Sequence, residues 1–295
     1  MYDIAFPHLG IFVEQISRGF SIFGFEIRYY GVIIGIAIII ATWIVSLDFE
    51  RKGMNLDNLY DILIYGIIFG TIGARLYYVA FTWDMYKDDP IQILNIRNGG
   101  LAIYGCIIAA VITILIYTRV KKLDFLNVMD SISLGLLFGQ GMGRWGNFFN
   151  CEAFGGYTDS LLAMRIRVPM ANAGMITQEL IDHLVTDGGA EYIQVHPTYL
   201  YESLWNLSLL AILLLYKKNR KFTGEVFLMY LAGYGIGRAW IEGLRTDSLL
   251  IPGTQLAVSQ LLAGACAVTA VTLIVLGRNG ILFREKKETE TDDIQ

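Results

Sequence analysis

The chain has 295 residues, of which 55% are hydrophobic and only 17% are charged. Soluble domains carry about 25% charged residues, so this composition indicates an integral membrane protein. The formal net charge of −4 argues against nucleic acid as a partner, because nucleic-acid binding favours a strongly basic face. Three cysteines and three histidines form neither a disulfide framework nor a zinc motif, so we expect no metal and no cofactor.

Residues 1–28 precede the first long apolar segment. They lack the basic start of a secretory signal peptide, and Asp3, Glu14 and Glu26 interrupt them. Their scattered apolar side chains, among them Phe20 and Phe23, are typical of an amphipathic segment. We therefore expect residues 1–28 to form an arm that lies on the outer membrane surface.

Seven apolar segments follow, and a run of about 20 apolar residues is long enough to cross a membrane as a helix. Three segments contain no charged residue, namely residues 29–47, 99–118 and 248–276. Four others carry one or two charges: residues 62–81, 125–149, 198–216 and 224–241. These segments predict an all-α integral membrane protein whose domain of residues 29–276 contains seven transmembrane helices.

The connecting loops predict the orientation of the chain. More than half of the 23 basic residues lie in the loops after the first, third and fifth segments and in the tail of residues 277–295. Because cytoplasmic loops are enriched in lysine and arginine, we expect a cytoplasmic C-terminus and an outer N-terminus. The longest outer loop, about residues 151–197, contains two glycine pairs and is large enough to form a small cap.

Polar side chains within the predicted spans gather near their outer ends. A charge at mid-membrane costs at least about 2.5–3.5 kcal/mol, so it has to be paired or to face a polar cavity. Among the charges within the spans, only Asp130 lies toward the inner half. The residues that converge at the outer level are Tyr30, Arg75, Tyr104, Arg144, Glu202, Arg238 and Glu242.

Glycines stand beside three of these arginines: Arg75, Arg144 and Arg238. Small residues let helices approach closely and expose backbone to a ligand, and an arginine fork suits a phosphate group. The pattern therefore predicts a pocket for a phospholipid head group. Two alternatives remain, in which the charges either tie the helices together or serve a transporter or flippase for an anionic lipid.

Six motifs, in order along the chain, resemble those of the bacterial prolipoprotein diacylglyceryl transferase family. The resemblance covers about residues 20–276. The motifs are Arg28-Tyr29-Tyr30-Gly31; Gly73-Ala74-Arg75; Asn98-Gly99-Gly100-Leu101-Ala102-Ile103-Tyr104-Gly105; Gly143-Arg144-Trp145-Gly146-Asn147-Phe148-Phe149-Asn150-Cys151-Glu152, followed by Gly155; His196-Pro197-Thr198-Tyr199-Leu200-Tyr201-Glu202; and Tyr234-Gly235-Ile236-Gly237-Arg238, followed by Glu242 and Arg245.

The resemblance implies a specific reaction at the bacterial plasma (inner) membrane. Members of this family transfer the diacylglyceryl group of phosphatidylglycerol to the lipobox cysteine in the signal peptide of a prolipoprotein. A thioether forms and glycerol phosphate is released, which is the first step of lipoprotein maturation. The implied partners are phosphatidylglycerol, the prolipoprotein and the surrounding membrane lipids.

The same resemblance implies roles for individual residues. Arg144 and Arg238 are expected to stabilise the charge on the departing phosphate, with Asn147 as a neutral donor. Many members carry a histidine, a proposed base, at the position of Tyr104; Glu202 and Glu242 are rival bases or partners of arginine. The expected catalytic residues are therefore Arg144, Arg238, Tyr104 and Glu242. The expected substrate-binding residues are Tyr30, Arg75, Asn147, Glu152, Gly155, Glu202 and Tyr234.

Two further residues of the motifs have ordinary explanations. Cys151 would need a nearby base or cation to act as a nucleophile, and a buried cysteine usually serves as a small apolar side chain. His196 precedes Pro197, which is typical of a helix start. We therefore expect no covalent enzyme intermediate and only a minor role for His196.

Overall fold

The computed structural model describes residues 2–96, 99–251, 253–254 and 256–282. Residue Asn98 of the third motif and most of the predicted tail lie outside the described residues. The described chain is mostly helical, as predicted. Its long helices are α1 (Tyr29–Arg51), α2 (Leu56–Phe81), α3 (Ile103–Val120), α4 (Phe125–Asn150), α6 (Thr198–Tyr216), α7 (Glu225–Glu242) and α8 (Val258–Arg278).

Five helices of the described chain are long and apolar enough to cross a membrane: α1, α2, α3, α6 and α8. They confirm the prediction of a membrane protein. The helices α4 and α7 have comparable lengths but are more polar. The polar residues of α4 include Asp130, Gln140, Arg144 and Asn147, and those of α7 include Glu225, Arg238 and Glu242.

The described residues also form β-structure, so the expectation of an all-α chain has to be corrected. Five strands form an antiparallel sheet in the order β2-β1-β5-β7-β6, and β3 pairs with β4 in a separate hairpin. The strands are β1 (Ile4–Phe6), β2 (Ile11–Val13), β3 (Gly19–Ile22), β4 (Phe25–Arg28), β5 (Met164–Arg167), β6 (Val185–Asp187) and β7 (Ala190–Val195). Strands of three to six residues are too short to show a clear alternating pattern in the sequence.

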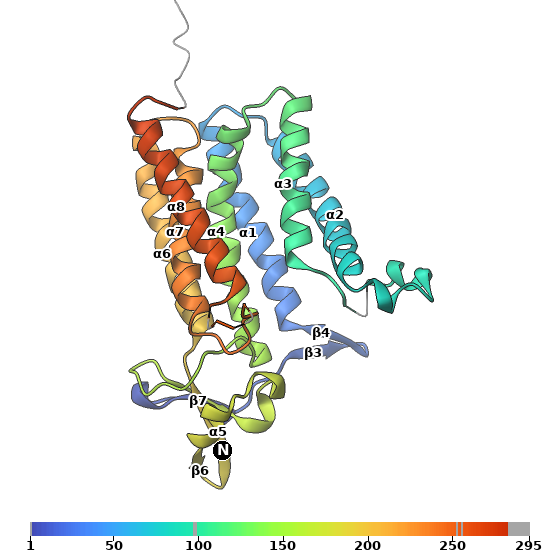
Figure 1. Cartoon of the computed structure of the whole chain (residues 1–295), viewed down its shortest axis with the longest axis vertical. Coiled ribbons are helices and arrows are strands. Elements are labelled where there is room, and N and C mark those ends of the chain that lie inside the picture. Colours follow the sequence, from blue (N-terminus) through green and yellow to red (C-terminus); the bar gives the residue numbers. More distant parts are fainter. Residues whose placement is uncertain (1, 97–98, 252, 255, 283–295) are drawn as a thin grey trace, which may run out of the picture. The chain divides into compact units, whose positions relative to one another are not determined.

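The chain divides into two compact units. One contains residues 1–44 and 132–295, and the other contains residues 45–131. The helices α1 and α4 each contribute to both units, because the boundaries at residues 44 and 132 fall inside them. In the first unit, α6, α7 and α8 pack side by side (Figure 1).

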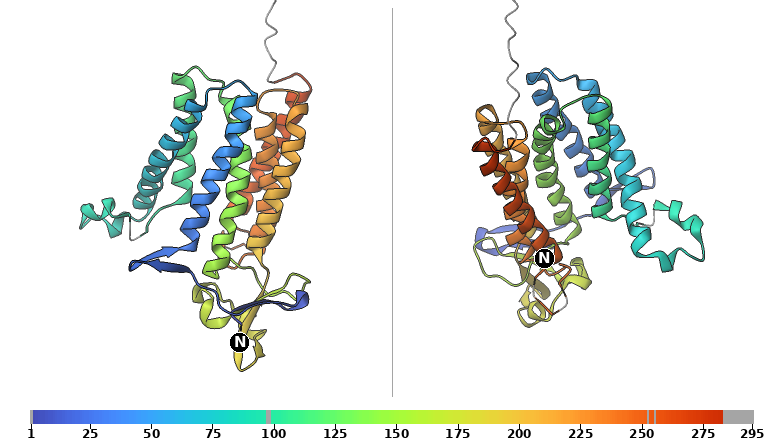
Figure 2. Two further views of the ribbon diagram at one scale, coloured as in Figure 1. Left: turned by 180° about the vertical axis from the view of Figure 1, so that it is seen from behind. Right: turned by 45° about the horizontal axis from the view of Figure 1, so that its top comes forward.

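The sheet of the first unit lies at the end of these helices where α6 begins and α4 ends (Figure 2). Its core contains Ile4, Phe154, Ile166 and Ile193, which are almost completely buried. Aromatic side chains connect this core to the helices, since the Trp145 ring of α4 packs edge-on against Tyr199 of α6. Short α5 (Gln178–Asp182) covers the same core through Leu180.

Strand β1 joins two segments that are distant in the sequence. Ile4 pairs with Ile166 of β5, so residues near the N-terminus complete a sheet made mainly from the loop of residues 151–197 (Figure 2). The neighbouring hairpin β3–β4 turns at Phe23 and Gly24, both with positive φ, which suits a two-residue hairpin turn. Residues 2–28 are therefore largely extended in this structure.

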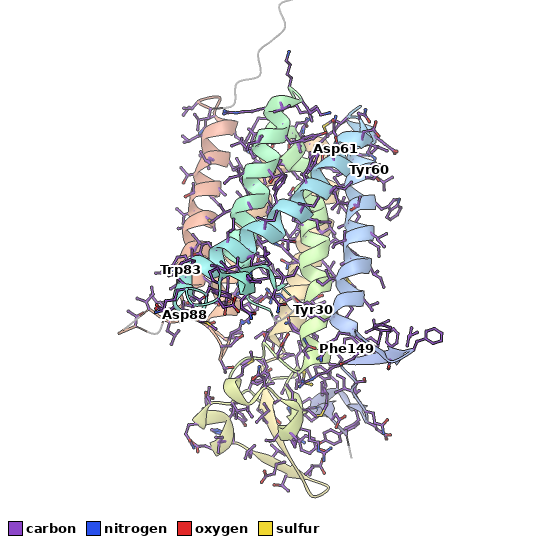
Figure 3. All side chains as sticks on the ribbon, turned by 90° about the vertical axis from the view of Figure 1, so that its right-hand side faces the viewer. Tyr30, Tyr60, Asp61, Trp83, Asp88 and Phe149 are labelled. Atoms are coloured by element: carbon purple, nitrogen blue, oxygen red, sulfur yellow. The ribbon has the colours of Figure 1, made fainter. Side chains whose placement is uncertain are left out.

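In the second unit, α2 and α3 pack closely where both helices have glycine. A Cβ atom at Gly73 would overlap Ala109, and one at Gly105 would overlap the backbone of Gly73. Small residues at these positions let the helix backbones come into contact. The labels in Figure 3 show Tyr60 and Asp61 at one end of α2, and Trp83 and Asp88 at the other.

Within each unit, the basic ends of the helices are tied by polar contacts. In the second unit, Lys52 donates to Ser131 Oγ at 2.8 Å, and the Tyr117 hydroxyl donates to Asp61 at 2.7 Å. In the first unit, Arg278 Nε donates to the buried Glu225 carboxylate at 2.6 Å. Within each unit, the basic residues in the short loops between helices therefore lie at one end of the helices.

Candidate functional site

Glu202 is the centre of a charged cluster in the first unit. This carboxylate lies in α6 and its residue is only 3% exposed. Arg144 Nη2 of α4 lies 2.6 Å from Glu202 Oε2, and Arg238 Nη1 of α7 donates to Oε1 at 2.8 Å. Arg245 Nη1 lies 3.7 Å from the same Oε1. Three guanidinium groups therefore converge on one buried carboxylate, which compensates the cost of burying its charge.

Glu242 extends this cluster toward α8. Its Oε2 forms an ion pair with Arg238 Nη2, one helical turn earlier on α7. Its Oε1 accepts hydrogen bonds from the hydroxyls of Ser248, at 2.9 Å, and Ser259, at 2.6 Å. We call Arg144, Glu202, Arg238, Glu242 and Arg245 the arginine–glutamate cluster. Within it, both carboxylates act as acceptors that hold guanidinium groups in place.

Arg144 and Arg238 differ in how fully they are engaged. Among the described residues, the ion pair of Arg144 is with Glu202 alone, whereas Arg238 contacts both Glu202 and Glu242. The Arg144 side chain is 22% exposed. Because a guanidinium carries five N–H donors, Arg144 keeps donors that can reach an additional anion. A phosphate is suited to such a site, since it accepts parallel hydrogen bonds from the fork.

Tyr30 lies directly against the helix that carries Arg144. A Cβ atom at Gly146 would overlap the Tyr30 ring, so the ring packs on the bare backbone of α4. The neighbouring Tyr29 ring lies 5.0 Å from that of Phe149. Figure 3 shows Tyr30 and Phe149 at the same end of their helices. Gly146 follows Arg144 by two residues, so the Tyr30 ring lies near Arg144 along α4. Tyr30 is 40% exposed and is therefore not enclosed.

The space beside two of the glycines near the arginines, Gly141 and Gly237, is filled by other side chains, whereas the space beside Gly139 is open. The Trp205 indole occupies the space beside Gly237, and its Nε1 donates to Gly233 O at 2.9 Å. Leu207 lies against Gly141 in the same way. These glycines therefore allow large side chains of α6 to pack against α4 and α7, which the sequence pattern could not distinguish from a ligand pocket.

Asn147 and Glu152 contact each other at the end of α4. The side-chain amides of Asn147 and Asn150 each donate to Glu152 Oε1 at 3.0 Å. Asn147 follows Arg144 by three residues and therefore lies on the same face of the helix. At least one N–H of the Asn147 amide is thus used within the protein.

Gly155 lies where two chain segments leave no space for a side chain. Its amide donates to His196 O at 3.0 Å, and it forms a β-bridge with Arg245. A Cβ atom there would overlap Leu244 O and His196 Cβ. Gly155 therefore positions the backbone of Arg245, which belongs to the arginine–glutamate cluster. Burial lowers the pKa of His196, so this ring is neutral at pH 7.

Tyr234 lies one turn before Arg238 on the same face of α7. Its ring stacks with that of Tyr230 at 5.8 Å. The first unit therefore brings together Tyr30, Arg144, Asn147, Glu152, Gly155, Glu202, Tyr234, Arg238 and Glu242 from four helices and the loop after α4.

Cys151 has the environment of a structural side chain. It is 2% exposed, and burial raises the pKa of its thiol to about 11. At neutral pH the thiol stays protonated, and a thiol is a far weaker nucleophile than a thiolate. The position of Cys151 thus agrees with the expectation that it does not form a covalent intermediate.

Arg75 belongs to the second unit and uses all of its donors on backbone. Its Nε donates to Ile93 O, its Nη1 to Gly99 O and Gly100 O, and its Nη2 to Gln92 O and Asn95 O, at 2.6–3.1 Å. The guanidinium also lies 5.1 Å from the centre of the Tyr86 ring. Since a guanidinium has five N–H groups, none remains for a phosphate. This geometry does not fit the expected substrate contact and makes Arg75 the anchor of the loop before α3.

Tyr104 is the second residue of α3 and is 40% exposed. It follows the loop that Arg75 holds, and the backbone of Ala102 donates to Ala74 O at 3.0 Å. Gly105, the next residue, lies against Gly73 of α2. The start of α3 is thus held from both sides, which defines the position of the Tyr104 backbone within the second unit.

One residue of the arginine–glutamate cluster, Arg245, and three residues around it were not assigned from the sequence. Arg245 is the last residue of the sixth motif. Its position three residues after Glu242 indicated that it could belong to the site, but it was not named as a site residue. Ser248, Ser259 and Trp205 carried no signal, because single polar or aromatic residues in apolar segments are common. Their roles depend on contacts across helices.

Comparisons with known proteins show the family of this chain. Residues 18–276 match the family described as prolipoprotein diacylglyceryl transferase. The chain is 39% identical over 238 residues to the phosphatidylglycerol–prolipoprotein diacylglyceryl transferase of Clostridioides difficile (strain 630), with 81% of this chain and 86% of the relative covered. Enzymes of the same name from Synechocystis sp. and Halalkalibacterium halodurans are 37% and 40% identical, and the matches cover 92% and 88% of this chain and 93% and 86% of the relatives.

These matches span most of the chain and include every motif that supplies the cluster. The protein therefore belongs to the prolipoprotein diacylglyceryl transferase family.

Proposed function

We propose that the protein transfers the diacylglyceryl group of phosphatidylglycerol to the lipobox cysteine of a prolipoprotein. The family membership and the names of the relatives support the transferase activity, and they do not favour a transporter or flippase. The observation that carries the proposal is the convergence of Arg144, Arg238 and Arg245 on the buried carboxylate of Glu202.

The reaction requires charge stabilisation at the lipid phosphate. The cysteine sulfur attacks the terminal carbon of the diacylglyceryl group, an S–C bond forms, and the C–O bond to phosphate breaks. The oxygen stays with the phosphate, which leaves as glycerol phosphate, and the thiol proton passes to a base. Negative charge therefore builds on that oxygen, and donors fixed in place beforehand stabilise it.

Arg144 and Arg238 supply these donors. Arg144 uses its remaining N–H groups for the phosphate, while Glu202 keeps both guanidinium groups oriented. Because Glu242 holds Arg238 and accepts from two serines, we assign it to positioning rather than to proton transfer. Tyr30, Asn147, Glu152, Gly155 and Tyr234 surround the head group or shape its site. Tyr104 remains the candidate that accepts the thiol proton.

We further propose that α4 and α7 cross the membrane together with the five apolar helices, which gives seven spans. The polar residues that make these two helices less apolar are paired within the protein, as for Arg144 and Arg238 with Glu202. Such pairing reduces the cost of placing charge in a membrane. The basic helix ends then lie in the cytoplasm, the cap of residues 151–197 and the N-terminus lie outside the plasma membrane, and residues 277–295 form a cytoplasmic tail.

Reconstitution tests the activity. The purified protein in liposomes containing phosphatidylglycerol is mixed with a lipobox peptide, and mass spectrometry measures the added diacylglyceryl group. We expect a thioether product with the cysteine peptide and none when that cysteine is serine or when phosphatidylethanolamine is the sole phospholipid. Movement of phosphatidylglycerol between leaflets without a covalent product would contradict the proposal.

A further inference from the structure

A polar cleft lies beside the end of α4 in the first unit. It has a volume of about 360 Å³ and is lined by Arg18, Arg28, Asn150, Glu152 and Asn172. The lining residues come from both ends of the segment that contains the β3–β4 hairpin, from the end of α4, and from the loop after β5. Since all five side chains are polar or charged, the cleft suits a water-soluble ligand and not an acyl chain.

The two arginines of the cleft keep most of their donors. Arg18 Nη2 donates to Met170 O at 3.3 Å, and Arg28 Nη2 lies 3.2 Å from Glu26 Oε1. Each guanidinium has five N–H groups, so several remain for a ligand. The lining holds two arginines and one carboxylate, that of Glu152, because Glu26, the partner of Arg28, does not line the cleft. This lining favours an anion.

Glu152 connects this cleft to the arginine–glutamate cluster. It lines the cleft and at the same time accepts from Asn147, which lies one turn after Arg144 on α4. The Asn147–Glu152 hydrogen bond therefore links the face of α4 that carries Arg144 to the lining of the cleft. The amides of Asn150 and Asn172 offer partners for the hydroxyl groups of a polyol.

We propose that the cleft binds a polyol phosphate monoester, namely the glycerol phosphate that the proposed reaction releases. This inference rests on the proposed function. A phosphate monoester carries about −1.5 to −2 charges at pH 7, whereas the phosphodiester of the lipid head group carries one. Two arginines that share one phosphate therefore favour the product over the substrate, so the cleft takes up the product before it leaves to water.

Direct binding to the full chain in detergent tests the proposal without any turnover. Two soluble probes are titrated calorimetrically: rac-glycerol 1-phosphate, a monoester, and glycerophosphoglycerol, the diester head group without its acyl chains. We expect the wild-type protein to bind the monoester more tightly. Arg18→Gln and Arg28→Gln should each weaken monoester binding about 10-fold, because each removes charge-assisted hydrogen bonds. Arg119→Gln, at an exposed arginine of α3 outside the cleft, is the matched control and should bind as wild type.

Turnover measurements separate a product site from a head-group site. In the two cleft variants, inhibition by glycerol phosphate should weaken about 10-fold, while the KM for phosphatidylglycerol changes less than about twofold. Equal loss of both probes together with a raised KM would overturn the proposal in favour of a head-group site. Unchanged binding in both variants would also overturn it. A wild-type protein without thioether product would instead contradict the proposed function, whatever the probes bind.

Discussion

Arg75 and Arg144 occupy similar places in the sequence, each beside glycine in a predicted span, yet their surroundings differ. Arg75 donates all five N–H groups to main-chain carbonyls within the second unit. Arg144, in the first unit, pairs with the Glu202 carboxylate and is 22% exposed. A guanidinium that is saturated by carbonyls holds backbone, whereas one paired with a carboxylate keeps donors for another anion.

Arginines on long helices of this protein therefore have two distinct uses. Carbonyl oxygens bound to Arg75 are fixed parts of a loop, and replacing them with a phosphate would leave buried carbonyls without partners. The oxygens of Glu202 are shared among three arginines. A phosphate can therefore bind one of these arginines while the Glu202 carboxylate keeps its other partners. Four predictions test this contrast.

The largest effect is expected at the arginine–glutamate cluster. Arg144→Gln and Arg238→Gln should each lower thioether formation by about 10²–10³ or more, since each removes a donor to the departing phosphate. Rates are measured in liposomes by mass spectrometry of the lipobox peptide. Arg144→Lys keeps the charge but not the fork and should recover only part of the rate. Near-normal turnover of both glutamine variants would reject the role of these arginines.

Tyr104 tests whether the second unit takes part in the chemistry. Tyr104→Phe should lower the rate about 10²-fold, because a positioned proton acceptor contributes at least that much. Tyr104→His should restore much of the rate, since a free imidazole, with a pKa of about 6.5, is largely unprotonated at pH 7 and can accept the thiol proton, whereas a free phenol, with a pKa of about 10, keeps its own. If the Phe variant is as active as the wild type, proton transfer occurs elsewhere.

Arg75 should respond as a structural residue. Arg75→Lys loses at least two of the five hydrogen bonds, because a lysine has three donors. We expect the rate to fall about 10-fold and the melting temperature to fall by at least about 2 °C, with the KM for phosphatidylglycerol unchanged. A raised KM at unchanged melting temperature would show that Arg75 binds the lipid directly.

The smallest effect is expected for Cys151→Ser. Burial keeps this thiol protonated at neutral pH, so the rate should stay within about twofold of wild type. Labelling of the folded protein with a thiol reagent should spare Cys151, and unfolding should make it reactive. Complete loss of activity in a variant with an unchanged melting temperature would make Cys151 part of the mechanism.

Much of the site could be predicted from the sequence because its residues stand out locally. Charges such as Arg144 and Glu202 are conspicuous in apolar segments, and their place along each predicted span predicted that they lie close together, as they do. The role of Arg75 could not be predicted this way. Its five acceptors are backbone carbonyls, which every residue has, so the amino-acid sequence does not distinguish them. Similarly, nothing in the sequence showed that Trp205 fills the space beside Gly237.

The sequence by itself determined that this chain is a mostly helical membrane protein, because hydrophobicity and charge act over a single run of residues. It also determined the family, since the motifs are contiguous strings. Only the tertiary structure decided that β1 completes a sheet with β5, that one carboxylate holds three arginines, and that Arg75 holds a loop. These features depend on distances between residues far apart in the chain, which local patterns do not encode.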